Sequence, residues 1–180
     1  MNKQLKFWLV SLWIIFSRAY DAYATYVFTP DLSKEMNPLA SILGLGWNPI
    51  LLIVMGLTLY VVYAYYCSEF KPYNITPTEK GFSFSQFCTF LYLGRKRHWT
   101  AVLYQLPTDF NRIRQYTGVV LSPSLAYAGV ISTLMWIGIN YTTFYKQYHN
   151  AYAIYGLLIL GVFGISIYKS WELYQVYDKD

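Results

Sequence analysis

Four apolar segments dominate the sequence, and each is close to the length of a membrane-spanning helix. They lie at about residues 7–28, 49–66, 118–139 and 151–168. A helix needs about 20 apolar residues to cross about 30 Å of hydrocarbon. Lipid cannot hydrogen-bond to the backbone, so a spanning segment has to be a helix or part of a closed barrel. These lengths predict an all-α polytopic membrane protein, a four-transmembrane-helix bundle that forms one domain over residues 1–180.

The composition agrees with a membrane environment. Only 13% of the residues are charged, and the chain contains 20 Tyr and 6 Trp. Soluble domains carry about 25% charged residues. Tyr and Trp are enriched at the two membrane–water interfaces, because their rings are amphipathic. The sequence therefore predicts that the lipid bilayer is the main partner of this chain.

The first apolar segment also has some features of a secretory signal peptide. Lys3 and Lys6 precede the apolar residues, and Ala22-Tyr23-Ala24 resembles a cleavage site. The apolar pattern, however, continues past this site through Phe28. We therefore expect the segment to remain as the first span.

The basic residues predict the orientation of the spans. With four spans and a cytoplasmic N-terminus, eleven of the 14 Lys and Arg are cytoplasmic, Lys34 and Lys146 are outside, and Arg18 lies within a span. Loops rich in Lys and Arg stay in the cytoplasm. The sequence thus predicts a multi-pass protein of the cell membrane with cytoplasmic N- and C-termini. Cys67 and Cys88 would then be in a reducing compartment.

Two Asn-Pro pairs lie between the first two apolar segments. Asn is a favoured N-cap and Pro a favoured first residue of a helix, so Asn37-Pro38 and Asn48-Pro49 each predict a helix start. The first start opens a short apolar helix that extends to about Leu43, before Gly44. This outer half-helix is too short to span the bilayer. It is either an interfacial helix or a re-entrant piece.

Residues 67–115 form the predicted cytoplasmic segment. An apolar stripe at helical spacing (Phe84, Phe87, Cys88 and Leu91) precedes the run Arg95-Lys96-Arg97-His98. This order is typical of an amphipathic helix on a lipid surface, which residues 99–106 would continue until Pro107 breaks it. We therefore predict amphipathic cytoplasmic surface helices. Arg95, Lys96 and Arg97 would contact lipid headgroups rather than nucleic acid.

The first apolar segment carries two charged residues at membrane depth. Arg18, Asp21 and Thr25 share one face of a 3.6-residue helix, and the first two are near enough to pair. Intramembrane charges usually pair with one another, and they often mark functional sites. The pair either fixes how the helix packs or forms an intramembrane polar site together with Glu35 and Asn37.

The same residues carry a resemblance to a known group. Asp21 and Thr25, followed by Glu35-x-Asn37-Pro38-Leu39 at the start of the next apolar segment, resemble a pattern in small bacterial integral membrane proteins of unknown function. The likeness covers about the first third of the chain. It implies a bacterial membrane origin and no particular activity.

No motif in the sequence predicts a metal, a cofactor or a catalytic centre. Asp21, Asp31, Glu35 and His149 would all lie on the outer side, but their spacing matches no metal motif. Glu35 has a simpler role, because a negative charge stabilises the N-terminus of the helix that follows it. The catalytic residues, if there are any, are unknown from the sequence.

Three functions of different classes remain open. The sequence favours a non-enzymatic accessory or scaffolding membrane subunit, which would bind other membrane subunits, because most polar residues have structural explanations. The first alternative is a small transport or binding module that uses the Arg18, Asp21 and Thr25 face. The second is a membrane-embedded enzyme that acts on lipid-linked substrates, with Asp21 or Glu35 as acid or base.

Overall fold

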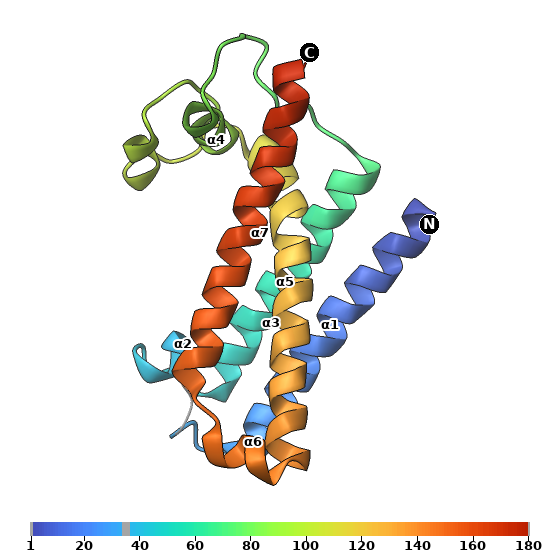
Figure 1. The fold of residues 1–180 in the computed structure, drawn as a ribbon, viewed down its shortest axis with the longest axis vertical. Coiled ribbons are helices and arrows are strands. Elements are labelled where there is room, and N and C mark those ends of the chain that lie inside the picture. The colour runs from blue at the N-terminus through green and yellow to red at the C-terminus, as the bar shows by residue number, and fades with distance from the viewer. Residues whose placement is uncertain (1, 34–36, 180) are drawn as a thin grey trace. The chain divides into compact units, whose positions relative to one another are not determined.

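A computed structural model describes residues 2–33 and 37–179 of the chain. In this part of the chain every regular element is a helix, as the ribbon shows (Figure 1). The elements are α1 (Lys3–Phe28), α2 (Pro38–Ser41), α3 (Trp47–Phe70), α4 (Phe84–Leu93), the 3-10 helix η1 (Trp99–Leu103), α5 (Phe110–Tyr141), α6 (Thr143–Tyr148) and α7 (Ala151–Lys179). The predicted all-α fold is confirmed for these residues.

The chain forms two compact units. Unit 1 comprises residues 1–60 and 125–162, and unit 2 comprises residues 61–124 and 163–180. The helices α3, α5 and α7 contribute residues to both units. A unit therefore combines segments that are far apart in the sequence.

Among the residues that the structure describes, three helices are long and apolar enough to cross a membrane. They are Trp47–Phe70, Phe110–Tyr141 and Ala151–Asp178, with mean hydropathies of 2.0, 1.5 and 1.9. Helix α1 is 26 residues long but does not belong to this set. The structure thus agrees with a multi-pass membrane protein.

Within unit 1, α1 packs against α5 through small residues. The Trp13 indole N–H donates a hydrogen bond to the Ala126 carbonyl across 3.0 Å. A Cβ atom added at Gly129 would clash with the Ser17 side chain. Small residues allow such close approach of helices in membranes, where van der Waals contact drives association.

The Asn-Pro pairs begin helices, with one shift in position. Asn37 caps α2, because its Oδ1 accepts a hydrogen bond from the Leu39 N–H at 3.1 Å. This predicted start is confirmed, but α2 ends at Ser41, before the predicted end at about Leu43. Helix α3 begins at Trp47, so Pro49 lies in its first turn. A proline is tolerated there because the first N–H groups of a helix have no partner within it.

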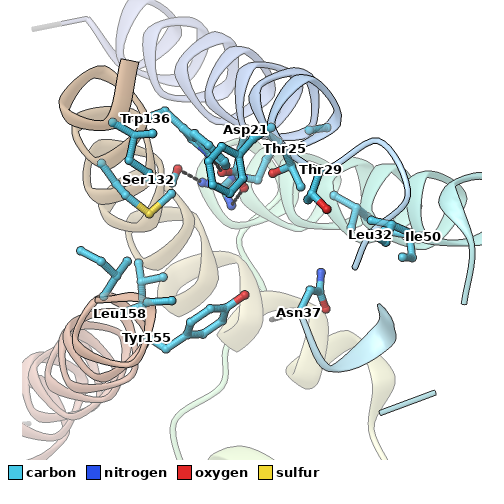
Figure 2. A pocket seen from close by; sticks show the side chains of 18 of the residues that line it. Asp21, Thr25, Thr29, Leu32, Asn37, Ile50, Ser132, Trp136, Tyr155 and Leu158 are labelled. Atoms are coloured by element: carbon cyan, nitrogen blue, oxygen red, sulfur yellow. Dashed lines mark hydrogen bonds and ion pairs between the residues drawn. The ribbon is translucent and has the colours of Figure 1, made fainter. Parts of the chain in front are cut away.

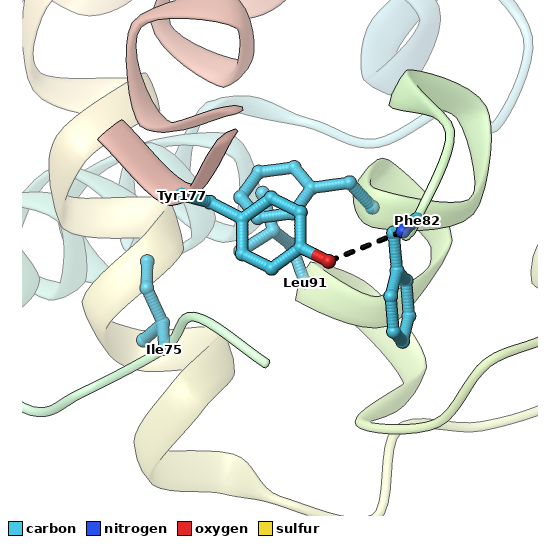
Figure 3. Close-up of a cluster of buried hydrophobic side chains, with 5 residues drawn as sticks. Ile75, Phe82, Leu91 and Tyr177 are labelled. Atoms are coloured by element: carbon cyan, nitrogen blue, oxygen red, sulfur yellow. Dashed lines mark hydrogen bonds between the residues drawn. The ribbon is translucent and has the colours of Figure 1, made fainter. Parts of the chain in front are cut away.

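Unit 2 has an aromatic core around α4. Ser83 and Gln86 form a capping box at its start, and Gly94 ends it with φ of 78°. Phe87 and Leu91 are fully buried against Tyr177 of α7 (Figure 3). The prediction that this stripe lies on a lipid surface is therefore wrong for Phe87 and Leu91. They pack on the protein, because α7 supplies an apolar partner that the local sequence does not reveal.

Helix α5 is longer than the span predicted at 118–139. Asp109 caps it, accepting hydrogen bonds from the N–H groups of Asn111 and Arg112 at 3.0 and 3.1 Å. The helix continues through Pro123 without a break. The hydroxyl groups of Ser122 and Ser124 donate to the carbonyls of Gly118 and Val120. The Asp109 cap and the predicted third span thus belong to one helix.

Candidate functional site

Unit 1 contains a cavity of about 340 Å³. Side chains from α1, α3, α5 and α7 and from the segment before α2 line it, as the close-up shows (Figure 2). The Tyr155 hydroxyl and the Asn37 amide point into the same space as Asp21 and Thr25. Small-molecule sites have volumes of about 300–1,000 Å³, so this cavity is large enough for a small ligand.

The charged pair on α1 lies at the cavity wall. Arg18 Nη1 is 3.4 Å from Asp21 Oδ2, and the two side chains are 20% and 30% exposed. The predicted pairing is thus confirmed. Two residues of α5 hold the pair in place: Arg18 Nη2 donates to Ser132 Oγ at 2.8 Å, and the Trp136 indole N–H donates to Asp21 Oδ1 at 2.8 Å. Each charge therefore has one partner on its own helix and one on α5.

Two nitrogen atoms of residues that line the cavity retain unused hydrogen-bonding capacity. Arg18 Nε and His149 Nδ1 are buried and have no hydrogen-bond partner among the described residues. Buried polar atoms are nearly always paired, and an exception calls for a physical reason. Both atoms belong to side chains that line the cavity, but the atoms themselves are buried away from the open space.

Burial also changes the acidity of His149, which lies between α6 and α7. Removal of the imidazole from water lowers its pKa below the usual value for histidine. The neutral form is therefore favoured near pH 7. A neutral imidazole offers one donor and one acceptor, so it can bind a ligand without adding a charge to the site.

The rest of the cavity wall is apolar. Ile50, Leu51 and Val54 come from α3, and Ile154 and Leu158 come from α7. The charges of Arg18 and Asp21 cancel, so the site has no strong net charge from this pair. Such a wall suits a small ligand with an apolar part and a few hydrogen-bonding groups, which fix its orientation.

The structure brings together four of the five residues that the sequence assigned to an intramembrane polar site. Arg18, Asp21, Thr25 and Asn37 all line the cavity. The fifth, Glu35, lies outside the described residues. The cations Arg95, Lys96 and Arg97, which were expected to contact lipid headgroups, belong to unit 2 and are exposed.

Sequence reasoning missed the residues that α5 and α7 supply. Ser132 and Trp136 are one turn apart on α5, and this spacing indicates a shared face. No pattern indicates that this face meets α1. Tyr155 had no signal, because the chain contains 20 Tyr and most have an interfacial explanation.

The described part of the cavity shows no catalytic or metal-binding arrangement. No group of three or more His, Cys, Asp or Glu in the described residues could hold a metal ion. Ser132 Oγ accepts from Arg18 and donates to the Gly129 carbonyl at 3.4 Å, so no base activates it.

Searches against protein families, curated proteins and solved structures give no match for this chain.

Proposed function

We propose that this chain is an integral membrane protein with four spans, in which α1 is the fourth. Helix α1 has 26 residues, a length of about 39 Å at 1.5 Å per residue. Arg18 and Asp21 bond to α5, whereas Trp8, Leu12 and Phe16 are exposed. The polar residues on the inward face lower the mean hydropathy of α1, although that face packs against α5 and does not meet lipid. The outward face suits hydrocarbon.

The termini distinguish four spans from three. Four spans place both ends of the chain on one side of the membrane, and the excess of Lys and Arg predicts the cytoplasmic side. Three spans would place the ends on opposite sides. Reporter enzymes fused to each end in turn should therefore both report the cytoplasm. Opposite locations would remove α1 from the set of spans.

We further propose that unit 1 binds a small amphipathic molecule in its cavity. The main support is that the polar residues Arg18, Asp21, Thr25 and Asn37 line about 340 Å³ of open volume. A pair that served packing alone would be expected to have filled surroundings, because protein interiors are close-packed. The binding module is therefore the function that the geometry supports best.

The other two functions predict different behaviour. An accessory subunit would keep fixed protein partners in mild detergent and would need no ligand. An enzyme that uses Asp21 as acid or base would lose activity in Asp21→Asn while keeping its fold. The cavity favours binding because its hydroxyl, amide and imidazole groups come from several helices and from the segment before α2, as expected for orienting a bound molecule.

The decisive experiment fills the cavity. Ala22 lines it, and Ala22→Phe would place a ring in the open space. The purified protein in detergent is heated with a panel of organic acids, amino acids, sugars and phosphate esters. A ligand at 100 times its Kd stabilises the folded state by about 2.7 kcal/mol and raises the unfolding temperature. We expect at least one compound class to do so in the wild type, and Ala22→Phe to abolish the effect.

Ala153→Phe is the matched control. Ala153 lies on α7 but is exposed, so the same ring is added away from the cavity. This variant should respond to the compound as the wild type does. If no compound raises the unfolding temperature of the wild type, while the protein co-purifies with a fixed partner, the binding proposal fails and the accessory subunit is supported.

A further inference from the structure

A second region with an unusual surface lies in unit 2, between α4 and α5. Residues 95–98 are Arg, Lys, Arg and His, and all four are exposed. Helix η1 and the residues after it contribute several exposed apolar side chains. We name residues 95–110 the basic-apolar segment.

The exposed apolar side chains of this segment are large. Val102 is 36% exposed and Trp99 is 55% exposed, and the others are between 73% and 81% exposed: Leu103, Tyr104, Leu106 and Phe110. Large apolar side chains gathered on one surface usually mark a site of contact with a partner or a membrane. Scattered single residues need no explanation, but these lie within twelve consecutive positions.

The segment is held in place by the rest of unit 2. Ala101 is buried, and Arg95 Nη2 donates to Gln105 Oε1 at 2.9 Å across the two ends of the turn. The Thr108 hydroxyl donates to the Leu93 carbonyl at 3.2 Å, which ties the segment to the end of α4. A fixed backbone presents the apolar side chains without an ordering cost at the moment of binding.

The cations beside these side chains are available for anions. Arg95, Lys96 and Arg97 form no ion pair within residues 2–33 and 37–179. Arg95 and Lys96 line a recess of about 260 Å³. Glu79 is the only carboxylate among the lining residues, so the described wall of the recess carries a positive balance.

We propose that the basic-apolar segment docks onto a leaflet that contains anionic phospholipid. Trp99, Leu103 and Leu106 would enter the boundary between headgroups and acyl chains, while the three cations bind headgroup phosphates. Apolar insertion combined with electrostatic attraction is how interfacial segments bind anionic membranes. The inference is separate from the proposed ligand of unit 1, and it needs only that the chain lies in a membrane.

The expected contribution of the cations is large. Each Lys or Arg close to an anionic surface favours binding by about fivefold. Loss of all three would therefore reduce insertion by about a hundredfold. Added salt should also reduce insertion, though by less, because it screens charges at the surface.

The test measures the depth of one side chain in full-length protein. Leu103→Cys, in a background with Cys67→Ala and Cys88→Ala, is labelled with the fluorophore NBD and reconstituted into nanodiscs. The lipid is phosphatidylcholine alone or phosphatidylcholine with phosphatidylglycerol, each doped with a lipid that carries a quencher on its acyl chain. We expect quenching with phosphatidylglycerol, and its loss when Arg95, Lys96 and Arg97 are all replaced by Gln.

A label at Ser85→Cys, an exposed polar position of α4, is the matched control and should remain unquenched. Equal and strong quenching of the Leu103 label in both lipids, unaffected by the three Gln substitutions, would overturn the recognition of anionic lipid. Absence of quenching in both lipids would overturn docking itself. Neither result depends on whether the unit 1 cavity binds a ligand.

Discussion

The cavity of unit 1 and the core of unit 2 use similar side chains in opposite ways. In unit 2 the aromatic rings fill the space: Phe87 contacts Tyr174 and Tyr177 with centroid separations of 5.4 and 5.3 Å. In unit 1, Trp136 and Tyr155 stand at the wall of about 340 Å³ of open volume. The open volume is therefore not explained by a lack of large side chains in unit 1.

The polar atoms of the two regions differ in the same way. The Tyr177 hydroxyl both accepts from the Phe82 N–H at 3.1 Å and donates to the Glu79 carbonyl at 2.8 Å, so its capacity is used. At the unit 1 cavity, Arg18 Nε and His149 Nδ1 have no partner among the described residues. A buried tyrosine with both hydrogen bonds made stabilises the fold, whereas the two unpaired nitrogen atoms belong to side chains that line open volume.

The largest effect on the free energy of unfolding is expected when one large apolar side chain in each region is replaced by alanine. Phe87→Ala should lower the free energy of unfolding by about 3–5 kcal/mol, because it opens a cavity in a filled core. Leu158→Ala at the unit 1 cavity should cost about 1 kcal/mol, since one side of Leu158 already lacks contacts. Denaturant titration of both variants in detergent measures the difference. Equal costs would mean that the two regions are packed alike.

A double-mutant cycle on the charged pair should give the next largest effect. Arg18→Leu and Asp21→Leu should each lower the free energy of unfolding by about 1–3 kcal/mol, because each leaves one partly buried charge without its partner. The double variant should cost less than the more damaging single variant. If the cost of the double variant equals the sum of the two single costs, the two residues are not coupled.

The smallest effect concerns pH and His149. Burial lowers the pKa of His149, so the unfolded chain binds a proton more readily than the folded protein does. The resulting stability is complete above the ordinary histidine pKa of about 6.5 and is lost as the pH falls through the lowered value. Unfolding temperatures measured from pH 7.5 downwards should therefore fall by a small amount, and His149→Gln should remove this part of the pH dependence.

Two carboxyl groups titrate at a lower pH than a histidine does, so they are not expected to produce this effect. The Arg112 N–H lowers the pKa of Asp109, and the Ser33 N–H lowers that of Asp31, both below the usual aspartate value of about 3.9. His98→Gln is the matched control, because His98 is exposed in unit 2 and lines no part of the unit 1 cavity. A pH dependence that persists in His149→Gln would assign it to other groups.

Local patterns were enough to predict much of the fold. The Asn37 cap depends on backbone groups within a few residues of it, and it is present. The Arg18–Asp21 contact was predictable for the same reason, since helix geometry places residues three apart on one face.

Contacts between distant segments were not predictable from the sequence. The stripe with Phe87 and Leu91 has the spacing of a lipid-facing helix, and only the position of Tyr177 shows that it faces protein. The apolar side chains that are exposed beside the basic residues 95–98 belong to residues 99–110 and not to the stripe of α4. Likewise, a polar face on α1 does not reveal whether a cavity or a filled interface lies opposite.

The hydrogen bonds from α1 to α5 have a consequence for how the protein is made. Arg18 precedes its partner Ser132 by 114 residues, and Asp21 precedes Trp136 by 115 residues. During synthesis α1 therefore leaves the ribosome long before α5 exists, and until then Arg18 and Asp21 have only each other as partners. The polar contacts that hold α1 in unit 1 are therefore completed only after α5 has been translated.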